Sequence, residues 1–454
     1  MRQIRIKEFF MKNKQKPWPN SIPVIAIIVM IGFASTACGE GAGGGGFIDD
    51  GIKINTDWYT DDPTAPSFNI GTPEELAGLA EIVNGTWDGT PVSFSFKDKT
   101  IVQTKDIDLG GKQWTPIGTE DDPFLGSYDG NGMNISGLKI VNNFADYKGL
   151  FGYIGEDGEV DAVTLLNVSI SYGEYNGALA GENHGIVHNC TVTGSVSGDR
   201  YIGGVTGRNY GIVTGCSFSG SVTSTGNYVG GVVGVNETGS SITNCFATGS
   251  VISHSYYAGG VAGRNYSAVE RCSAKNSVTA NYSNAGGITG INETGSSIAN
   301  CYTASTVKAR VGVSDYAGGI TGANKAGSFI ANCYATGSVE GSWVGGICFS
   351  NDGSITNSIA LNTKITGSYN AYRVCNGGTR INNYCSSEIP IDGEKISSDD
   401  FRSILNGNHG KNVDAADYNT LSWWTTAANW DTTPWDFDDV WAWGDNNLPK
   451  LKWE

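Results

Sequence analysis

The stretch GGVVGVNETGSSITNCFATGSV, residues 230–251, decides the fold, because variants of it recur along the chain. A repeat with a period of roughly 20–50 residues is typical of a chain built from stacked structural units. The copies begin at Gly177, Gly203, Gly230, Gly259, Gly286, Gly318 and Gly345. A series of similar units presents a long surface more readily than it builds a single catalytic pocket.

Each copy contains short apolar runs that are rich in Val and Ile and are bounded by Gly, Asn and Ser. Such runs indicate β-strands separated by tight turns. One copy is long enough for a coil of about three short strands, and coils stacked about 4.8 Å apart pair each strand with the coils above and below. The repeat therefore predicts an all-β fold, a parallel β-helix or β-solenoid of about eight to nine coils.

Two further positions of the repeat form rows along the stack. Asn recurs at Asn183, Asn209, Asn236, Asn265, Asn292, Asn324 and Asn351. Cys recurs at Cys190, Cys216, Cys245, Cys272, Cys301 and Cys333. Stacked Asn side chains are expected to hydrogen-bond between coils, with ligand binding as the alternative. The cysteines are expected to be free core residues. Disulfide pairing is the alternative, and Cys348, Cys375 and Cys385 outside the row are its better candidates. No metal site is expected, because the chain has no CxxC pair.

The repeat resembles the GLUG motif of bacterial surface and secreted proteins, and residues 230–251 are close to its consensus. Upstream, FNIGTPEELAGLAEIVN (residues 68–84) and FLGSYDGNGMNISGLKI (residues 124–140) are similar to the usual lead-in to these repeats in surface proteins of Bacteroides-like bacteria. The resemblance covers roughly residues 68–385. It implies a right-handed parallel β-helix or a closely related solenoid in a surface lipoprotein or adhesin. It supplies no catalytic signature, so no catalytic residue is expected.

The first 38 residues have the pattern of a secretory signal, with basic residues, an apolar run at residues 22–33 and small residues before Cys38. This ending resembles a bacterial lipobox and implies lipidation of Cys38, although Ser35 stands where Leu is usual. The protein is therefore expected to be exported and lipid-anchored at the outer membrane or cell surface. An ordinary signal peptide or a membrane anchor is the alternative. Residues 39–67, rich in Gly and Asp, are expected to form a flexible tether.

A solenoid exposes strand edges at both ends and needs caps. Residues 68–148 are assigned to an N-terminal cap and the first coils, residues 149–385 to the GLUG-repeat solenoid, and residues 386–454 to a Trp-rich C-terminal cap. Each cap is expected to contain a helix. A capping box that begins at Thr72 predicts a helix at Pro73–Val83.

At the other end, Ser398 can begin a short helix at residues 399–405. The tryptophans after it are expected to cover the last coil, with stacking on sugar rings as the alternative. They are Trp423, Trp424, Trp430, Trp435, Trp441, Trp443 and Trp453.

The net charge of −16 argues against nucleic acid and anionic membrane surfaces as partners. Acidic residues of the repeats do not recur at one position in adjacent coils, whereas acid–base cleavage of sugars uses paired carboxylates. The protein is therefore expected to be a non-enzymatic monomer without a cofactor, attached to a membrane only through its lipid. A β-helical polysaccharide lyase or epimerase is the enzymatic alternative, and a purely structural stalk is another. The sequence DGNG at residues 129–132 predicts a turn rather than a calcium loop.

An aromatic row is the candidate binding surface. It lies two residues before the opening Gly of most copies, at Tyr175, Tyr201, Tyr228, Tyr257, Tyr316 and Trp343, with Asn284 in place of the aromatic residue in one copy. Stacked rings stabilise neighbouring coils, which is the structural interpretation. A continuous aromatic stripe could also bind a glycan. The expected function is that of an adhesin or binding scaffold for a glycan or a host or matrix protein, with Tyr201, Tyr228, Tyr257, Tyr316 and Trp343 as candidate site residues.

Overall fold

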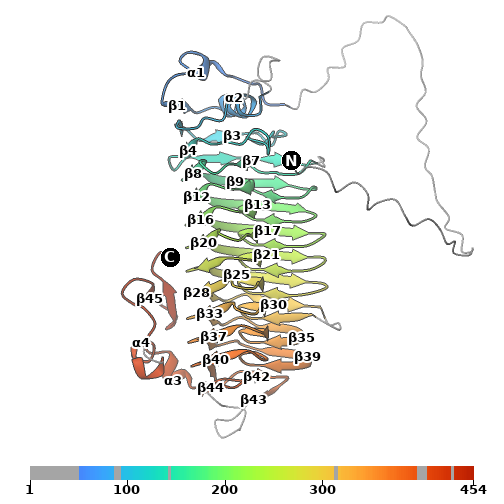
Figure 1. Cartoon of the computed structure of the whole chain (residues 1–454), viewed down its shortest axis with the longest axis vertical. Helices are drawn as coiled ribbons and strands as arrows, with labels where there is room; N and C mark the ends of the chain where they lie inside the picture. The colour runs from blue at the N-terminus through green and yellow to red at the C-terminus, as the bar shows by residue number, and fades with distance from the viewer. Residues whose placement is uncertain (1–50, 86–93, 142–144, 311–314, 396–405, 431–433) are drawn as a thin grey trace, which may run out of the picture. The chain divides into compact units, whose positions relative to one another are not determined.

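The computed structural model describes residues 51–85, 94–141, 145–310, 315–395, 406–430 and 434–454. The described residues form one compact unit in which short parallel strands are stacked coil upon coil (Figure 1). The predicted all-β solenoid is confirmed. It has about 11 turns rather than eight or nine. The extra turns lie mainly upstream of the first repeat copy, where strand register continues although the repeat letters do not.

Three parallel sheets run along the stack. The strands of the first are β1 (Ser67–Ile70), β2 (Thr100–Gln103), β4 (Ser127–Asp129), β8 (Glu159–Asp161), β12 (Ile186–His188), β16 (Ile212–Thr214), β20 (Ser241–Thr243), β24 (Ala268–Glu270), β28 (Ser297–Ala299), β33 (Phe329–Ala331), β37 (Ser354–Thr356) and β40 (Thr379–Ile381). The strands of the second are β7 (Phe151–Ile154), β11 (Ala180–Asn183), β15 (Thr206–Asn209), β19 (Val233–Asn236), β23 (Ala262–Asn265), β27 (Thr289–Asn292), β32 (Thr321–Asn324) and β36 (Cys348–Asn351).

The third sheet contains the longest strands. These are β9 (Thr164–Ile170), β13 (Thr191–Gly198), β17 (Ser217–Ser224), β21 (Phe246–Ser253), β25 (Ser273–Ala280), β35 (Val339–Gly345) and β39 (Ile365–Tyr372). A shorter strand, β30 (Thr306–Ala309), lies between β25 and β35 and pairs with both. The other shorter strands of this sheet are β3 (Ile107–Asp108), β5 (Asn134–Ser136), β6 (Lys139–Ile140), β10 (Asn176–Gly177), β14 (Ile202–Gly203), β18 (Val229–Gly230), β22 (Ala258–Gly259), β26 (Ala285–Gly286), β29 (Tyr302–Thr303), β31 (Tyr316–Gly318), β34 (Tyr334–Ala335), β38 (Ile359–Ala360), β41 (Tyr384–Ser386), β42 (Pro390–Ile391), β43 (Glu394–Lys395) and β44 (Lys411–Val413).

The Asn row forms a hydrogen-bonded ladder inside the stack. Each Nδ2 group donates to the Oδ1 atom of the equivalent Asn in the next coil, at 2.8 or 2.9 Å, from Asn183 through to Asn351. These side chains are fully or almost fully buried. The ladder therefore satisfies polar groups that would be costly to leave unpaired in the core, and the structural interpretation of this row is confirmed.

The Cys row lies in the apolar core. All nine cysteines of the described residues are free and buried, including Cys348, Cys375 and Cys385. In the row, each thiol donates to a carbonyl oxygen two residues earlier, as Cys190 does to His188 at 3.0 Å. Ser358 occupies the next rung and makes the same bond to Thr356. Burial raises the pKa of the Cys385 thiol to about 12, so this thiol is held protonated.

The N-terminal cap is helical. Helix α2 (Pro73–Val83) begins with the predicted capping box: Thr72 Oγ1 accepts from the Glu75 amide at 3.2 Å, and the Glu75 carboxylate accepts from the Thr72 amide at 3.1 Å. The chain is already folded from residue 51, inside the predicted tether. A short helix, α1 (Asp57–Thr60), buries Tyr59 against Phe68 and Phe96. Cys38 and the export signal lie outside the described residues.

The tryptophans do not sit over the last coil. Helices α3 (Ala415–Tyr418) and α4 (Leu421–Thr425), a 3₁₀ turn η2 (Ala427–Asn429) and the hairpin β45 (Trp441–Trp443) and β46 (Pro449–Leu451) run back along the flank of the solenoid, so that the C-terminus lies beside its middle coils (Figure 1). We call residues 415–430 and 434–454 the C-terminal strap. The helix expected at residues 399–405 lies outside the described residues.

The strap packs on an aromatic column formed by the residue after the Cys position. Tyr302, Tyr334, Ile359 and Tyr384 occupy this column in successive coils. They form one cluster with the strap's buried tryptophans, Trp424, Trp430, Trp435 and Trp441. Large aromatic side chains are stable when their surface is buried against other apolar groups, and this column supplies such a surface along the flank of the solenoid. No helix among the described residues has the length and apolar character needed to span a bilayer.

Candidate functional site

Five tyrosines stack along one corner of the solenoid. Tyr147, Tyr175, Tyr201, Tyr228 and Tyr257 have successive ring centroids 4.7, 4.6, 5.2 and 5.6 Å apart. We call these five residues the tyrosine ladder. Their stacking covers the ring faces within the ladder and directs ring edges outward. A ligand at this corner would therefore meet edges and hydroxyl groups more than open ring faces.

The structure brings together three of the five predicted site residues and separates the other two. Tyr201, Tyr228 and Tyr257 belong to the ladder. Asn284, in the next coil, ends it. Beyond this break Tyr316 packs on Phe349 with ring centroids 5.1 Å apart, and Trp343 stacks on Tyr369 at 5.4 Å.

The backbone of the ladder is unusual for tyrosine. Tyr147, Tyr175, Tyr201 and Tyr228 have φ angles of 58°, 55°, 60° and 63°. This left-handed region favours Gly and Asn and costs other residues roughly 1–2 kcal/mol. Elsewhere in the repeat, the position before the Cys row uses Asn for the same geometry, as at Asn189 with φ 53°. The ladder thus places a bulky ring where a smaller residue would fit the backbone better.

Two arginines lie on the ladder. The Arg208 guanidinium is 5.5 Å from the Tyr201 ring and 4.7 Å from the Tyr210 ring. The Arg264 guanidinium is 5.3 Å from Tyr228 and 4.5 Å from Tyr266. A cation within about 6 Å of a ring face is attracted by its quadrupole. Arg208 and Arg264 therefore bind the ladder to the loop tyrosines of their own coils.

Each of these arginines also pairs with a glutamate of the next coil. Arg208 Nε lies 2.7 Å from Glu237 Oε1, and Arg264 Nη2 lies 2.6 Å from Glu293 Oε1. The arginines belong to the segment GRNY, which occurs at residues 207–210 and 263–266, and the glutamates belong to the segment NETGSSI, at residues 236–242 and 292–298. The two segments alternate along the stack, and one supplies the arginine and the other the glutamate. Sequence analysis did not predict this pairing, although both segments recur with the same spacing.

A buried acid lies near the first rungs of the ladder. Glu182 is buried, and its Oε1 atom lies 2.7 Å from His184 Nε2, which is also 2.7 Å from the Tyr153 hydroxyl. The His184 ring stacks between Tyr153 and Tyr210. Burial, followed by the charge of Glu182, raises the pKa of Tyr153 well above its usual value, so this phenol stays protonated. Sequence reasoning did not single out this cluster, because Tyr153 and His184 come from different coils.

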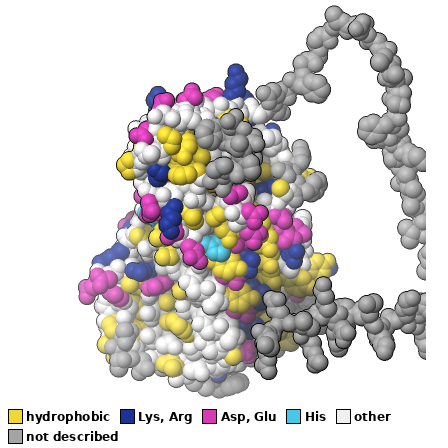
Figure 2. Space-filling view, turned by 45° about the horizontal axis from the view of Figure 1, so that its top comes forward, with side chains coloured by type: hydrophobic (Ala, Val, Ile, Leu, Met, Phe, Trp, Pro, Cys, Tyr) yellow, Lys and Arg dark blue, Asp and Glu magenta, His cyan; other side chains and the backbone are white. Residues whose placement is uncertain are grey.

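Three phenols of the ladder have pKa values above the ordinary value for tyrosine. Burial, followed by the charge of Glu182, raises the pKa of Tyr147 to about 12. Burial also raises the pKa values of Tyr175 and Tyr257. On the face seen in Figure 2, acidic and basic side chains are interspersed with hydrophobic ones.

The described residues contain no group of three or more His, Cys, Asp or Glu side chains that could hold a metal ion. The DGNG segment forms the predicted turn: Asp129 Oδ1 accepts from the Asn131 amide at 2.7 Å, and Asn131 and Gly132 have φ angles of 51° and 71°. Its side chains serve the turn.

The repeat and the fold define a β-solenoid built from GLUG motifs. The family described as the GLUG motif matches residues 198–223, 225–252 and 254–279, which confirms that the chain carries these repeats.

Two curated relatives match parts of the chain. Halomucin of Haloquadratum walsbyi is 34% identical over 148 residues, which are 29% of this chain and 2% of that protein. A protein of Evansella cellulosilytica named "Putative Gly-rich membrane protein" is 39% identical over 89 residues, which are 19% of this chain and 10% of that protein. The matches therefore span only a small fraction of each relative's length.

One solved structure is similar in outline. It is named as that of a "putative immunoglobulin A1 protease" from Bacteroides ovatus, and it has 19% sequence identity and a TM-score of 0.42 over 86% of this chain and 93% of that chain.

Proposed function

We propose that the chain is an exported cell-surface lipoprotein whose solenoid is a non-enzymatic binding scaffold, an adhesin for a glycan. Two observations support the surface location: the signal pattern that ends at Cys38, and similarity to a relative named as a membrane protein. A host or matrix protein is the other class of partner that such a surface could bind. The tyrosine ladder is the observation that supports a binding role most directly.

The stability balance of the ladder favours this role. A left-handed backbone costs tyrosine roughly 1–2 kcal/mol, and each stacked ring pair contributes roughly 0.5–1.5 kcal/mol. The two terms nearly cancel, so stacking alone gives little net reason to place tyrosine there. Strained backbone positions cluster at functional sites. A series of four such tyrosines therefore supports a surface selected for contact with a ligand.

The ladder suits an extended polymer that runs parallel to the solenoid axis. Its hydroxyl groups recur once per coil, about every 4.8 Å. Arg208 and Arg264 are partly exposed beside it and lie two coils, or about 10 Å, apart. A linear glycan would meet the same donors at successive sugars, chiefly through hydrogen bonds to its hydroxyl groups.

The double variant Tyr201→Asn with Tyr228→Asn is expected to fold and to lose glycan binding. Asn tolerates the left-handed backbone, so the free energy of unfolding should change by less than about 1 kcal/mol. Binding on a glycan array should fall at least about tenfold, since two donors and two aromatic surfaces are removed.

Tyr172→Asn is the matched control, because Tyr172 also has a positive φ, 62°, and is exposed outside the ladder. It should bind like the unmodified protein. A folded double variant with unchanged array binding would overturn the ladder as a binding surface, and an unmodified protein that binds nothing on glycan or matrix-protein arrays would favour the stalk.

Cys38→Ala is expected to move the protein from the membrane fraction to the soluble fraction. The acyl chains on this residue would supply the membrane affinity, at about 0.8 kcal/mol per buried CH₂ group. Fractionation followed by immunoblotting measures the change, with Ser35→Ala as a control that keeps the acceptor thiol. Retention of the Cys38→Ala protein in membranes would refute lipid anchoring.

The Glu182, His184 and Tyr153 cluster is the one observation that favours the enzymatic alternative. It combines a carboxylate, an imidazole and a phenol within hydrogen-bond distance, which are groups used in acid–base chemistry. Unsaturated or epimerised products from acidic polysaccharides would support this function in place of the scaffold.

A further inference from the structure

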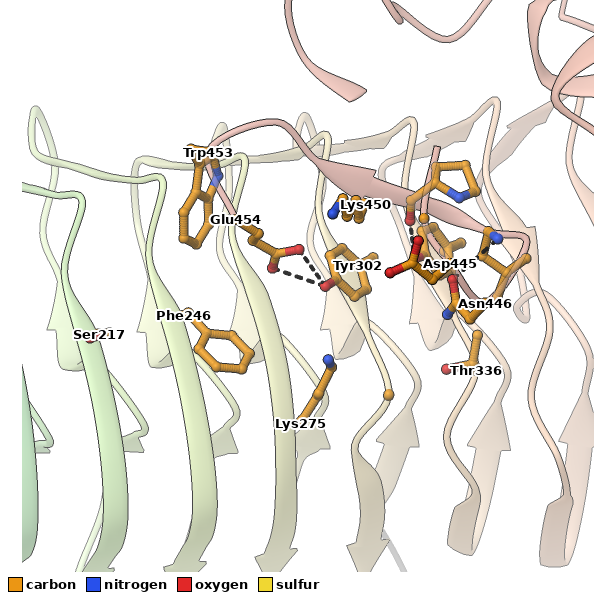
Figure 3. Close-up of a pocket in the computed structure, with 15 residues that line it drawn as sticks. Ser217, Phe246, Lys275, Tyr302, Thr336, Asp445, Asn446, Lys450, Trp453 and Glu454 are labelled. Carbon is orange, nitrogen blue, oxygen red and sulfur yellow. Dashed lines mark hydrogen bonds between the residues drawn. The ribbon is translucent and has the colours of Figure 1, made fainter. Parts of the chain in front are cut away.

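We propose that a cleft between the C-terminal strap and the solenoid is a second binding site, which takes a carboxylated sugar unit of a glycan. The cleft has a volume of about 660 Å³. This lies within the roughly 300–1,000 Å³ of typical small-molecule pockets. Its floor is the outer face of β17, β21, β25, β29 and β34, and its roof is the end of the strap (Figure 3).

Aromatic side chains line the cleft from both sides. Phe246 and Tyr302 come from the solenoid, and Trp453 comes from the strap (Figure 3). Within the described residues, neither Phe246 nor Trp453 packs against another aromatic ring, and Trp453 is 39% exposed. No aromatic ring of the described residues covers their faces, unlike those of the tyrosine ladder, although the Lys275 ammonium lies over one face of Phe246. Aromatic faces of this kind are what the apolar C–H groups of a sugar ring stack upon.

Two lysines give the cleft its preference for an acid. Lys275 rises from the floor and Lys450 reaches in from the strap, on opposite sides of Tyr302 (Figure 3). Among the described residues neither ammonium group forms an ion pair, and the Lys275 ammonium lies 5.8 Å from the centroid of the Phe246 ring. In a chain of net charge −16, two such cations facing one cleft can bind a ligand carboxylate.

The cleft is also lined by two acids, Glu454 and Asp445, and among the described residues neither forms an ion pair with Lys275 or Lys450. The Glu454 carboxylate accepts from the Tyr302 hydroxyl at 2.7 and 2.9 Å and also from the Ser273 hydroxyl, so its oxygens are engaged. Asp445 and Asn446 line the end of the cleft away from Phe246 and Trp453 (Figure 3). Exposed amide and carboxylate groups at that end can bind the hydroxyl groups of a neutral sugar unit.

Docking of the strap does not account for these lysines. The strap is held by its buried tryptophans, by Trp453 Nε1 donating to the Arg271 carbonyl at 3.0 Å, and by the Tyr334 hydroxyl donating to the Pro449 carbonyl at 2.5 Å. Lys275 and Lys450 take part in none of these contacts. Both lysines are therefore available to bind a ligand in the cleft.

Calorimetric titration with a short oligomer of galacturonic acid tests the site, with the galactose oligomer of equal length as the neutral probe. The acidic oligomer is expected to bind at least about tenfold more tightly. Lys275→Met and Lys450→Met should each weaken it about tenfold without changing the melting temperature, because both side chains are exposed. Lys308→Met, which removes an exposed lysine outside the cleft, should change nothing.

The inference stands apart from the tyrosine ladder, and the variants separate the two. The Tyr201→Asn, Tyr228→Asn protein should bind the acidic oligomer normally, and its loss of binding would place the acidic ligand on the ladder and overturn the cleft. Equal binding of acidic and neutral oligomers, or unchanged affinity in both lysine variants, would also overturn it. Equal binding of poly-glutamate with the same lysine dependence would overturn the assignment to a sugar.

Discussion

Replacing Asn236 by Ala is expected to destabilise the central coils by about 4 kcal/mol. Its Nδ2 group donates to Asn265 Oδ1 at 2.9 Å and to the Ala268 carbonyl at 3.2 Å, and its Oδ1 atom accepts from Asn209 at 2.9 Å and from Ser240 at 2.7 Å. The substitution removes four buried hydrogen bonds, each of which contributes roughly 0.5–1.5 kcal/mol. Asn265 Oδ1, Asn209 Nδ2 and Ser240 Oγ each keep another partner. Urea unfolding followed by circular dichroism measures the loss.

Hydrogen exchange should show which coils lose stability in the Asn236→Ala protein. Because coils contact only their neighbours, a solenoid can open locally around a weakened coil. Amides of β19 and β20 should exchange faster than those of β7 or β36. Asn281→Ala is the control, since within the described part of the chain the Asn281 side chain hydrogen-bonds only to His254, at 3.3 Å near the surface. It should cost less than about 0.5 kcal/mol. An Asn236→Ala protein as stable as the control would mean that these bonds do not hold the ladder.

Much of the fold could be predicted because parallel, in-register stacking places equal sequence positions side by side. A row such as the asparagines becomes a ladder, and a row such as the cysteines becomes a line of core side chains. The capping box at Thr72 and Glu75 was equally readable, since its geometry depends on residues only three apart.

The number of coils could not be counted from the repeat, because stacking needs strand register and does not need the consensus letters. Tyr128 pairs with Ile101 on one side and with Val160 on the other, in coils that precede the first copy. Any residues that alternate between buried and exposed can fill such a rung. Coils without Gly-Gly or Asn-Cys pairs were therefore missed.

The candidate sites, like the fold, could be predicted only in part. The position of Tyr201, Tyr228 and Tyr257 in one row followed from the period, but the covering of their ring faces depends on side-chain packing between coils. The cleft was missed altogether, although one signal existed: the residue after the Cys row becomes aromatic at Phe246, Tyr302 and Tyr334. The return of the strap over these residues is a long-range contact that no local pattern encodes.

Replacing Trp441 by Ala is expected to release the strap while the coils stay folded. The Trp441 side chain is fully buried, with ring centroids 4.7 Å from Trp435, 6.1 Å from Tyr334 and 6.4 Å from Tyr302. Its loss should cost roughly 3–5 kcal/mol. A short segment held mainly by one aromatic cluster has little other local stability to offset this. Exchange mass spectrometry should show rapid exchange across residues 434–454 and unchanged protection in β12, β16 and β20.

The same measurement separates a strap from a true cap. A cap shields the strand edges of a terminal coil, so its loss should propagate fraying into the last coils. A strap lies across coils whose strands are already paired on both sides, so its loss should leave them intact. Trp453→Ala is the matched control: this ring is 39% exposed and makes one hydrogen bond, to the Arg271 carbonyl, so protection of residues 434–451 should persist. If Trp441→Ala instead removes protection from β37, β40 and β44, the tryptophans are part of the solenoid's end cap, and the cleft beneath the strap depends on the folding of the last coils.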